Sequence, residues 1–153
     1  MLRGLLNALL RARPMNRADL QQLANDRVED ARILLLQNRW TAAYYLVGYA
    51  VETALKACIL RFVEETGIIF KDKKFAEKCW THRIEDLVTQ ANLKPQLGLD
   101  IQANAALGGH WGVVEGWTEV SRYEQKTETE ARNLYNAVTN VPDGAFRWIQ
   151  QHW

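Results

Sequence analysis

The stretch AAYYLVGYAVETALKACILR (residues 42–61) decides the fold of this chain. From Ala42 to Leu60 it is apolar on nearly every side of a helix, and only Glu52 and Lys56 carry charge. A helix with apolar residues all round has to be enclosed by other helices. The sequence therefore predicts a central helix that Thr41 opens and Gly67 ends, since glycine suits the left-handed residue after a helix.

An amphipathic helix is predicted before this central helix. Over residues 17–38 the apolar side chains recur at intervals of three and four, which gives one apolar stripe. Asn16 can cap this helix, and Asp19 in its first turn suits the positive end of the helix dipole.

Further helices are predicted after the central one. Residues 68–80 are expected to form a loop or a short helical turn, followed by a helix over 82–92 with Thr81 as its cap. Pro95 suits the first turn of a helix over 95–107, and Gly108–Gly109 is expected to end it.

The remaining segments are also predicted to be helical. In residues 110–125 the apolar residues have helical spacing but are interrupted by glycines, which indicates a short or irregular helix. His110 is expected to lie in an exposed turn. Thr127 and Glu130 form a capping box, and Asp143 is expected to cap a last helical turn.

These elements predict an all-α fold, an up-and-down antiparallel bundle of four to five main helices. No run alternates with the period of two that strands require. With 153 residues, 48% hydrophobic and 24% charged, the chain has the composition of one ordinary globular domain. We place that domain at residues 16–153.

Residues 1–15 are interpreted separately. Their leucines share one helical face beside Arg3, Arg11 and Arg13, as in a basic amphipathic anchor or a targeting peptide. Alternatively, this tail reflects a start codon assigned upstream, and the domain opens at Met15.

Composition and motifs exclude several classes of function. The net charge of +1 argues against a strong overall attraction to nucleic acid or anionic lipid, although a local patch remains possible. Phosphate-loop, dinucleotide and serine-hydrolase motifs are absent, and the three histidines and two cysteines lack metal-site spacing. We therefore expect no metal, no cofactor and no membrane span, and free cysteines in a cytoplasmic protein.

Three polar residues are candidates for a binding site. Glu52 and Lys56 are four residues apart, in the favourable orientation for an ion pair. They either neutralise each other in a seam between helices or line a polar pocket. His82 begins a helix, where it either lies near the cap or presents a neutral, acceptor-capable imidazole.

Arg122 and Tyr123 form a second candidate pair. Arg122 can form an ion pair with Glu52 or Glu119. Alternatively, its donors and the tyrosine ring suit a phosphate and a stacked base.

Taken in order, these residues resemble the HEPN superfamily (higher eukaryotes and prokaryotes nucleotide-binding domain). The stretch at 42–61, with Glu four residues before Lys, is similar to the signature helix of that family. Thr81-His82 before IEDLV and the Arg122–Tyr123 pair follow in the family's order, so the resemblance covers about residues 17–141.

The resemblance implies a bacterial helical domain, often a homodimer, from defence or toxin-antitoxin systems. It implies binding of RNA or a nucleotide, or of a nucleotidyltransferase-like or antitoxin protein, with Glu52, Lys56, His82, Arg122 and Tyr123 as the binding cluster. Catalytic members are metal-independent endoribonucleases that use Arg, then four to six residues, then His. Arg147 and His152 match that spacing, although Trp148 stands where active members place a small polar residue.

We therefore expect a HEPN-like binding module rather than a nuclease. One alternative is a metal-independent endoribonuclease that uses Arg147 and His152, or Arg122 with a histidine brought close by folding. The other is a module that only binds proteins through its tryptophans.

Overall fold

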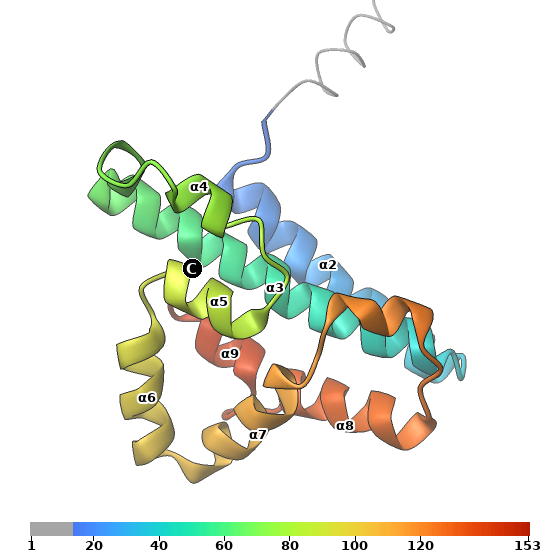
Figure 1. Cartoon of the computed structure of the whole chain (residues 1–153). Helices are drawn as coiled ribbons and strands as arrows, with labels where there is room; N and C mark the ends of the chain where they lie inside the picture. The colour runs from blue at the N-terminus through green and yellow to red at the C-terminus, as the bar shows by residue number, and fades with distance from the viewer. Residues whose placement is uncertain (1–13) are drawn as a thin grey trace, which may run out of the picture.

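The computed structural model describes residues 14–153, whose regular secondary structure is all helical (Figure 1). Eight α-helices and two 3-10 segments follow one another, with no β-strand in this range. The all-α prediction is confirmed, whereas residues 1–13 of the predicted tail lie outside the described part. None of the helices in residues 14–153 is long and apolar enough to cross a membrane.

Two long antiparallel helices dominate the fold, α2 (Arg17–Leu36) and α3 (Trp40–Thr66) (Figure 1). The Asn16 side chain accepts a hydrogen bond from the Asp19 amide, and the Asp19 carboxylate accepts one from the Asn16 amide, so α2 begins at a capping box. Helix α2 ends two residues earlier than expected, where Asn38 (φ 56°) lies in the turn into α3. Gly67 (φ 61°) ends α3 as predicted.

The rest of the described chain consists of shorter elements. In order they are η1 (Ile68–Phe70), α4 (Phe75–Lys78), α5 (Ile84–Gln90), α6 (Lys94–Ala103), α7 (Ala105–Glu115), η2 (Glu119–Tyr123), α8 (Glu128–Thr139) and α9 (Ala145–Gln150).

Helix α3 is the central element, as its sequence predicts. It contacts α2, α5, α8, α9 and η2, and its apolar residues from Val47 to Ile59 are almost all buried. Five helices (α2, α3, α6, α7 and α8) have ten or more residues, which roughly fits the predicted number of main helices. The order is less regular than a simple up-and-down bundle, because α6 lies across the direction of α3 (Figure 1).

The predicted helix break at Gly108–Gly109 is wrong. Both glycines lie inside α7, so His110 is on a helix and not in a turn. The break comes earlier, at Asn104, whose side chain accepts the amides of Ala106 and Leu107 and so starts a new helix. A Cβ atom at Gly108 would lie 3.0 Å from the Ile101 side chain, so glycine lets α6 and α7 pack closely here.

Two predicted caps are also wrong. The Thr81 hydroxyl accepts the Arg83 amide and donates to Asp86, while Arg83 occupies the cap position of α5. The Asp143 carboxylate instead accepts a hydrogen bond from the Asn104 side chain, 39 residues away in sequence. The Thr127 capping box forms as predicted.

Candidate functional site

Glu52 and Lys56 of α3 form one polar cluster with His82, which precedes α5. Lys56 Nζ donates to Glu52 Oε1 at 2.7 Å, which is the predicted ion pair, and His82 Nδ1 lies 3.0 Å from the same oxygen. The Glu52 side chain is only 1% exposed, whereas that of His82 is 50% exposed. The carboxylate is thus buried, and the imidazole it holds reaches the surface.

Packing of α5 brings His82 to this position. Ile84, Leu87 and Val88 are buried in the core, which fixes the start of α5 against α3. His82 immediately precedes this helix, 30 residues from Glu52 in sequence. The second carboxylate oxygen, Glu52 Oε2, is buried and has no hydrogen-bond partner among residues 14–153.

Arg122 and Tyr123 lie on η2 and make a separate group. The Arg122 guanidinium carbon is 4.9 Å from the centre of the Tyr123 ring, and the Tyr123 side chain is largely exposed. Hydrogen bonding to Tyr123 and, secondarily, to Tyr45 raises the pKa of Arg122. Arg122 therefore contacts aromatic rings, while Glu52 is held by Lys56 and His82.

One face of α3 connects the two groups. Tyr45, Tyr49, Glu52 and Lys56 follow at intervals of four, three and four, which places them along one stripe. The rings of Tyr45 and Tyr49 are parallel, with centres 6.1 Å apart. Seven residues separate Tyr45 from Glu52, which is a rise of roughly 10 Å along the helix. The predicted binding residues thus occupy two places along one face.

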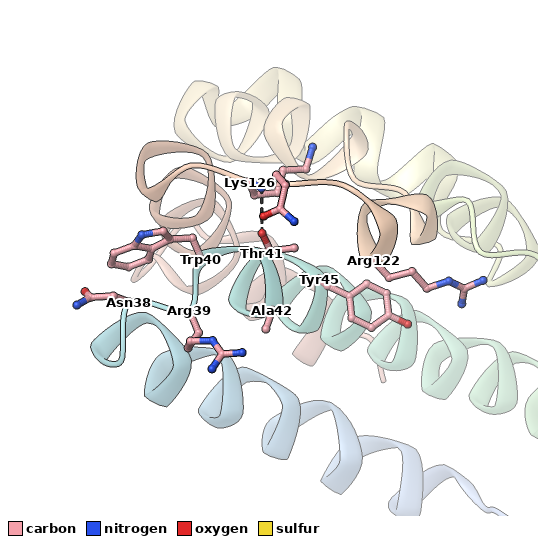
Figure 2. A pocket seen from close by; sticks show the side chains of 9 residues that line it. Asn38, Arg39, Trp40, Thr41, Ala42, Tyr45, Arg122 and Lys126 are labelled. Atoms are coloured by element: carbon pink, nitrogen blue, oxygen red, sulfur yellow. Dashed lines mark hydrogen bonds between the residues drawn. The ribbon is translucent and has the colours of Figure 1, made fainter.

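A pocket of about 530 Å³ lies at the N-terminus of α3, beside Arg122 (Figure 2). Arg39, Arg122 and Lys126 line it together with the aromatic rings of Trp40 and Tyr45. Its remaining lining residues are Asn38, Thr41, Ala42 and Gln125, so no acidic residue of the described part lines it, although Glu124 and Glu130 lie close to Lys126. Figure 2 shows Arg122 next to Tyr45 on one side, with Arg39 and Trp40 on the other.

One hydrogen bond joins two segments of the pocket wall that are distant in sequence. The Lys126 amide donates to the Thr41 hydroxyl at 3.0 Å, which ties the chain after η2 to the first turn of α3. Lys126 Nζ is 2.7 Å from Glu124 and 4.7 Å from the centre of the Tyr44 ring. Sequence reasoning did not select Arg39, Trp40 or Lys126 as site residues. The Asn-Arg-Trp-Thr run at the helix junction (residues 38–41) is the signal that could have suggested the first two.

Arg147 and His152 lie at the C-terminal end of the chain, in and after α9. Arg147 is exposed, whereas the His152 ring packs 4.4 Å from the Trp148 ring. His152 Nε2 is buried without a hydrogen-bond partner in the described residues, and burial lowers the pKa of His152. Neither residue lines the pocket beside Arg122.

Cys58 and Cys79 are both free thiols. Cys58 is buried in α3, and this burial raises its pKa to about 12. Within residues 14–153, no group of three or more His, Cys, Asp or Glu side chains is placed to hold a metal ion.

Comparison of the chain with protein-family models, with curated proteins and with solved structures finds no match.

Proposed function

We propose that this protein binds a phosphate-bearing ligand, RNA or a nucleotide, in the pocket at the N-terminus of α3. The observation that carries this proposal is the lining of the pocket, in which Arg39 and Arg122 occur with two aromatic rings and no acidic residue, while the third cation, Lys126, is paired with Glu124. Phosphate recognition uses cationic donors, and base recognition uses aromatic faces.

The helix terminus adds to the attraction for an anion. Helix α3 has 27 residues, and no side chain in the described part of the molecule caps its N-terminus at Arg39. The first amide groups of a helix lack partners within it, and the helix dipole places partial positive charge there. An anion in the pocket would therefore meet these amides as well as Arg39 and Arg122.

The exposed aromatic residues favour a nucleotide or single-stranded RNA over a simple anion. The Tyr123 ring is 78% exposed, and Arg122 covers one of its faces. A base that stacks near this pair would place its phosphate within reach of the guanidinium. Because the net charge of the chain is only +1, we expect the attraction for phosphate to be confined to this pocket and not spread over the whole surface.

The resemblance to the HEPN superfamily supports the same proposal. It extends the proposal to a cytoplasmic homodimer in a bacterial defence or toxin-antitoxin system, with a nucleotidyltransferase-like or antitoxin protein as a further partner. The proposed role of the chain is binding, and RNA cleavage is the alternative.

Binding of a fluorescently labelled single-stranded RNA, followed by anisotropy from low to moderate salt, tests the proposal. We expect the Arg39→Ala/Arg122→Ala double variant to bind about tenfold more weakly. We also expect its salt slope to decrease by about one for each phosphate that the variant no longer neutralises. Arg83→Ala is the matched control, because Arg83 is exposed and outside the pocket.

Equal binding by the wild type and the double variant would refute this pocket as the site. The same samples, kept in EDTA and analysed by gel, test the enzymatic alternative. RNA cleavage that disappears in Arg147→Ala and His152→Ala would replace the binding proposal by an endoribonuclease.

A further inference from the structure

We propose that His82 is a phosphoryl-accepting histidine that is modified at Nε2, with Glu52 and Lys56 as its positioning residues. This modification site goes beyond the proposed function and does not depend on it, because none of the three residues lines the pocket at the N-terminus of α3.

The geometry fixes which nitrogen of His82 is the nucleophile. A carboxylate can only accept hydrogen bonds, so the hydrogen between Glu52 Oε1 and His82 lies on Nδ1. In the neutral imidazole the lone pair is then on Nε2. Nδ1 faces a buried carboxylate, half of the side chain is exposed, and no residue within 14–153 is hydrogen-bonded to Nε2, so Nε2 is the nitrogen left to react.

Burial strengthens the effect of Glu52 on the ring. The carboxylate is 1% exposed, and its only hydrogen-bond partners in the described residues are Lys56 and His82, both on Oε1. Hydrogen bonds in a low-dielectric interior are electrostatically stronger than in water. Glu52 therefore orients the imidazole and increases the electron density at Nε2, as carboxylates do for histidines that bind metals.

The proposed step is a phosphoryl transfer from a donor of the phosphoramidate class, to which a phosphohistidine of another protein also belongs. The Nε2 lone pair forms a bond to phosphorus while the P–N bond of the donor breaks. The leaving nitrogen takes the electron pair of that bond together with a proton from solvent. Nδ1 keeps its hydrogen, so the phosphorylated ring carries positive charge that the Glu52 carboxylate stabilises.

Lys56 supplies the counter-charge for the transferred group. Its Nζ lies 2.7 Å from the oxygen that also holds His82, and its side chain is 31% exposed. Its positive charge offsets the negative charge of Glu52, which reduces the repulsion between that carboxylate and an incoming phosphoryl group. The cluster thus combines a nucleophile, an orienting base partner and a cation.

The other two histidines of the chain provide an internal comparison. His152 has its Nε2 buried and its ring against Trp148, which shields it from a donor. His110 is half-buried on α7, and no carboxylate within residues 14–153 is hydrogen-bonded to its ring. We therefore expect His82 to react before either of them.

The test is incubation of the full chain with potassium phosphoramidate near neutral pH. Intact mass and peptide mapping identify the modified residue, and ³¹P NMR distinguishes Nε2 from Nδ1 phosphorylation. We expect one phosphoryl group on His82 Nε2, none in His82→Gln, and a rate about tenfold lower in Glu52→Gln. Glu85→Gln is the matched control, because Glu85 is exposed and pairs with Lys94.

Two results would overturn the proposal without any variant. One is modification of His110 or His152 ahead of His82, and the other is Nδ1 as the modified nitrogen of His82. If Glu52→Gln folds, as circular dichroism would report, and reacts at the wild-type rate, the positioning role of Glu52 is refuted.

Discussion

The substitution Gly48→Ala tests the packing of Trp117, which lies between α7 and η2, against α3. A Cβ atom at Gly48 would lie 2.2 Å from both Cδ1 and Nε1 of Trp117 and 2.3 Å from Cγ. Non-bonded carbon atoms prefer about 3.5 Å or more, so the indole would have to move by about 1.3 Å. Trp117 is 1% exposed and also packs against the Tyr45 ring, so moving the indole disturbs a buried neighbour.

Two opposing effects decide the magnitude. Alanine stabilises a helix interior by about 1 kcal/mol relative to glycine. Overpacking of a well-packed core costs about 1–3 kcal/mol, and a displacement of the size needed at Trp117 belongs at the upper end. We therefore expect Gly48→Ala to lower the free energy of unfolding by about 2 kcal/mol, which corresponds to a drop in Tm of roughly 4–8 °C.

Two other helical glycines give matched controls with the opposite sign. At Gly98 in α6 and Gly112 in α7, an added Cβ would have no atom within 4 Å. Each change to alanine should raise the free energy of unfolding by about 0.5–1 kcal/mol. Urea denaturation followed by circular dichroism measures all three variants, and unchanged m-values would show that the native and unfolded states remain comparable.

The double variant Gly48→Ala/Trp117→Leu isolates the contact itself. Because the smaller side chain removes the clash, Gly48→Ala should cost less in the Trp117→Leu background, with a coupling energy above about 1 kcal/mol. If Gly48→Ala instead stabilises the protein as the Gly98 and Gly112 variants do, the reasoning about this contact is wrong.

Three further predictions concern thiols, pH and capping. A thiol reagent near pH 8 should modify Cys79 first and Cys58 only after unfolding, because burial raises the pKa of Cys58 to about 12. Reaction of both thiols at the same rate would contradict this prediction. Burial lowers the pKa of His152 in the folded state, so the unfolded chain binds more protons than the folded one below about pH 6.5. The free energy of unfolding should therefore fall as the pH drops from about 6.5 toward the folded-state pKa. Urea titrations at several pH values should show a flatter profile for His152→Gln in that window. Thr127→Ala should cost about 1 kcal/mol in the same assay, since it removes the acceptor for the Glu130 amide; a change near zero would mean that the cap is unimportant.

Local patterns in the sequence predict most of the long helices. The end of α3 at Gly67 and the caps at Asn16 and Thr127 depend on residues within one turn of each other, so they can be inferred from sequence alone. The start of α3 differs slightly, because the helix begins at Trp40 and not at the predicted Thr41. The error at Asp143 has a tertiary cause, whereas the Thr81 hydroxyl is bonded locally to the Arg83 amide and to Asp86. The Asp143 carboxylate accepts a hydrogen bond from Asn104, and that contact joins segments 39 residues apart in sequence.

The same distinction applies to the candidate sites. The Glu52–Lys56 ion pair is a spacing of four on one helix and follows from sequence. Sequence order groups His82 with them but does not show that its Nδ1 shares an oxygen with Lys56. The pocket at the N-terminus of α3 could not be inferred, because its wall depends on the contact of Lys126 with Thr41 across 85 residues.

Both candidate sites form where irregular chain, and not a long helix, covers α3. The side of α3 that packs on α2 is closed by apolar side chains such as Ala24 and Ala31. The stripe from Tyr45 to Lys56 is covered instead by η2 and by the segment that leads into α5, which contribute Arg122 and His82. Short irregular segments can expose polar side chains while a rigid helix fixes their positions. Changes in η2 or at Tyr45 should therefore affect the pocket at the N-terminus of α3, whereas changes at Glu52 or Lys56 should affect the His82 cluster.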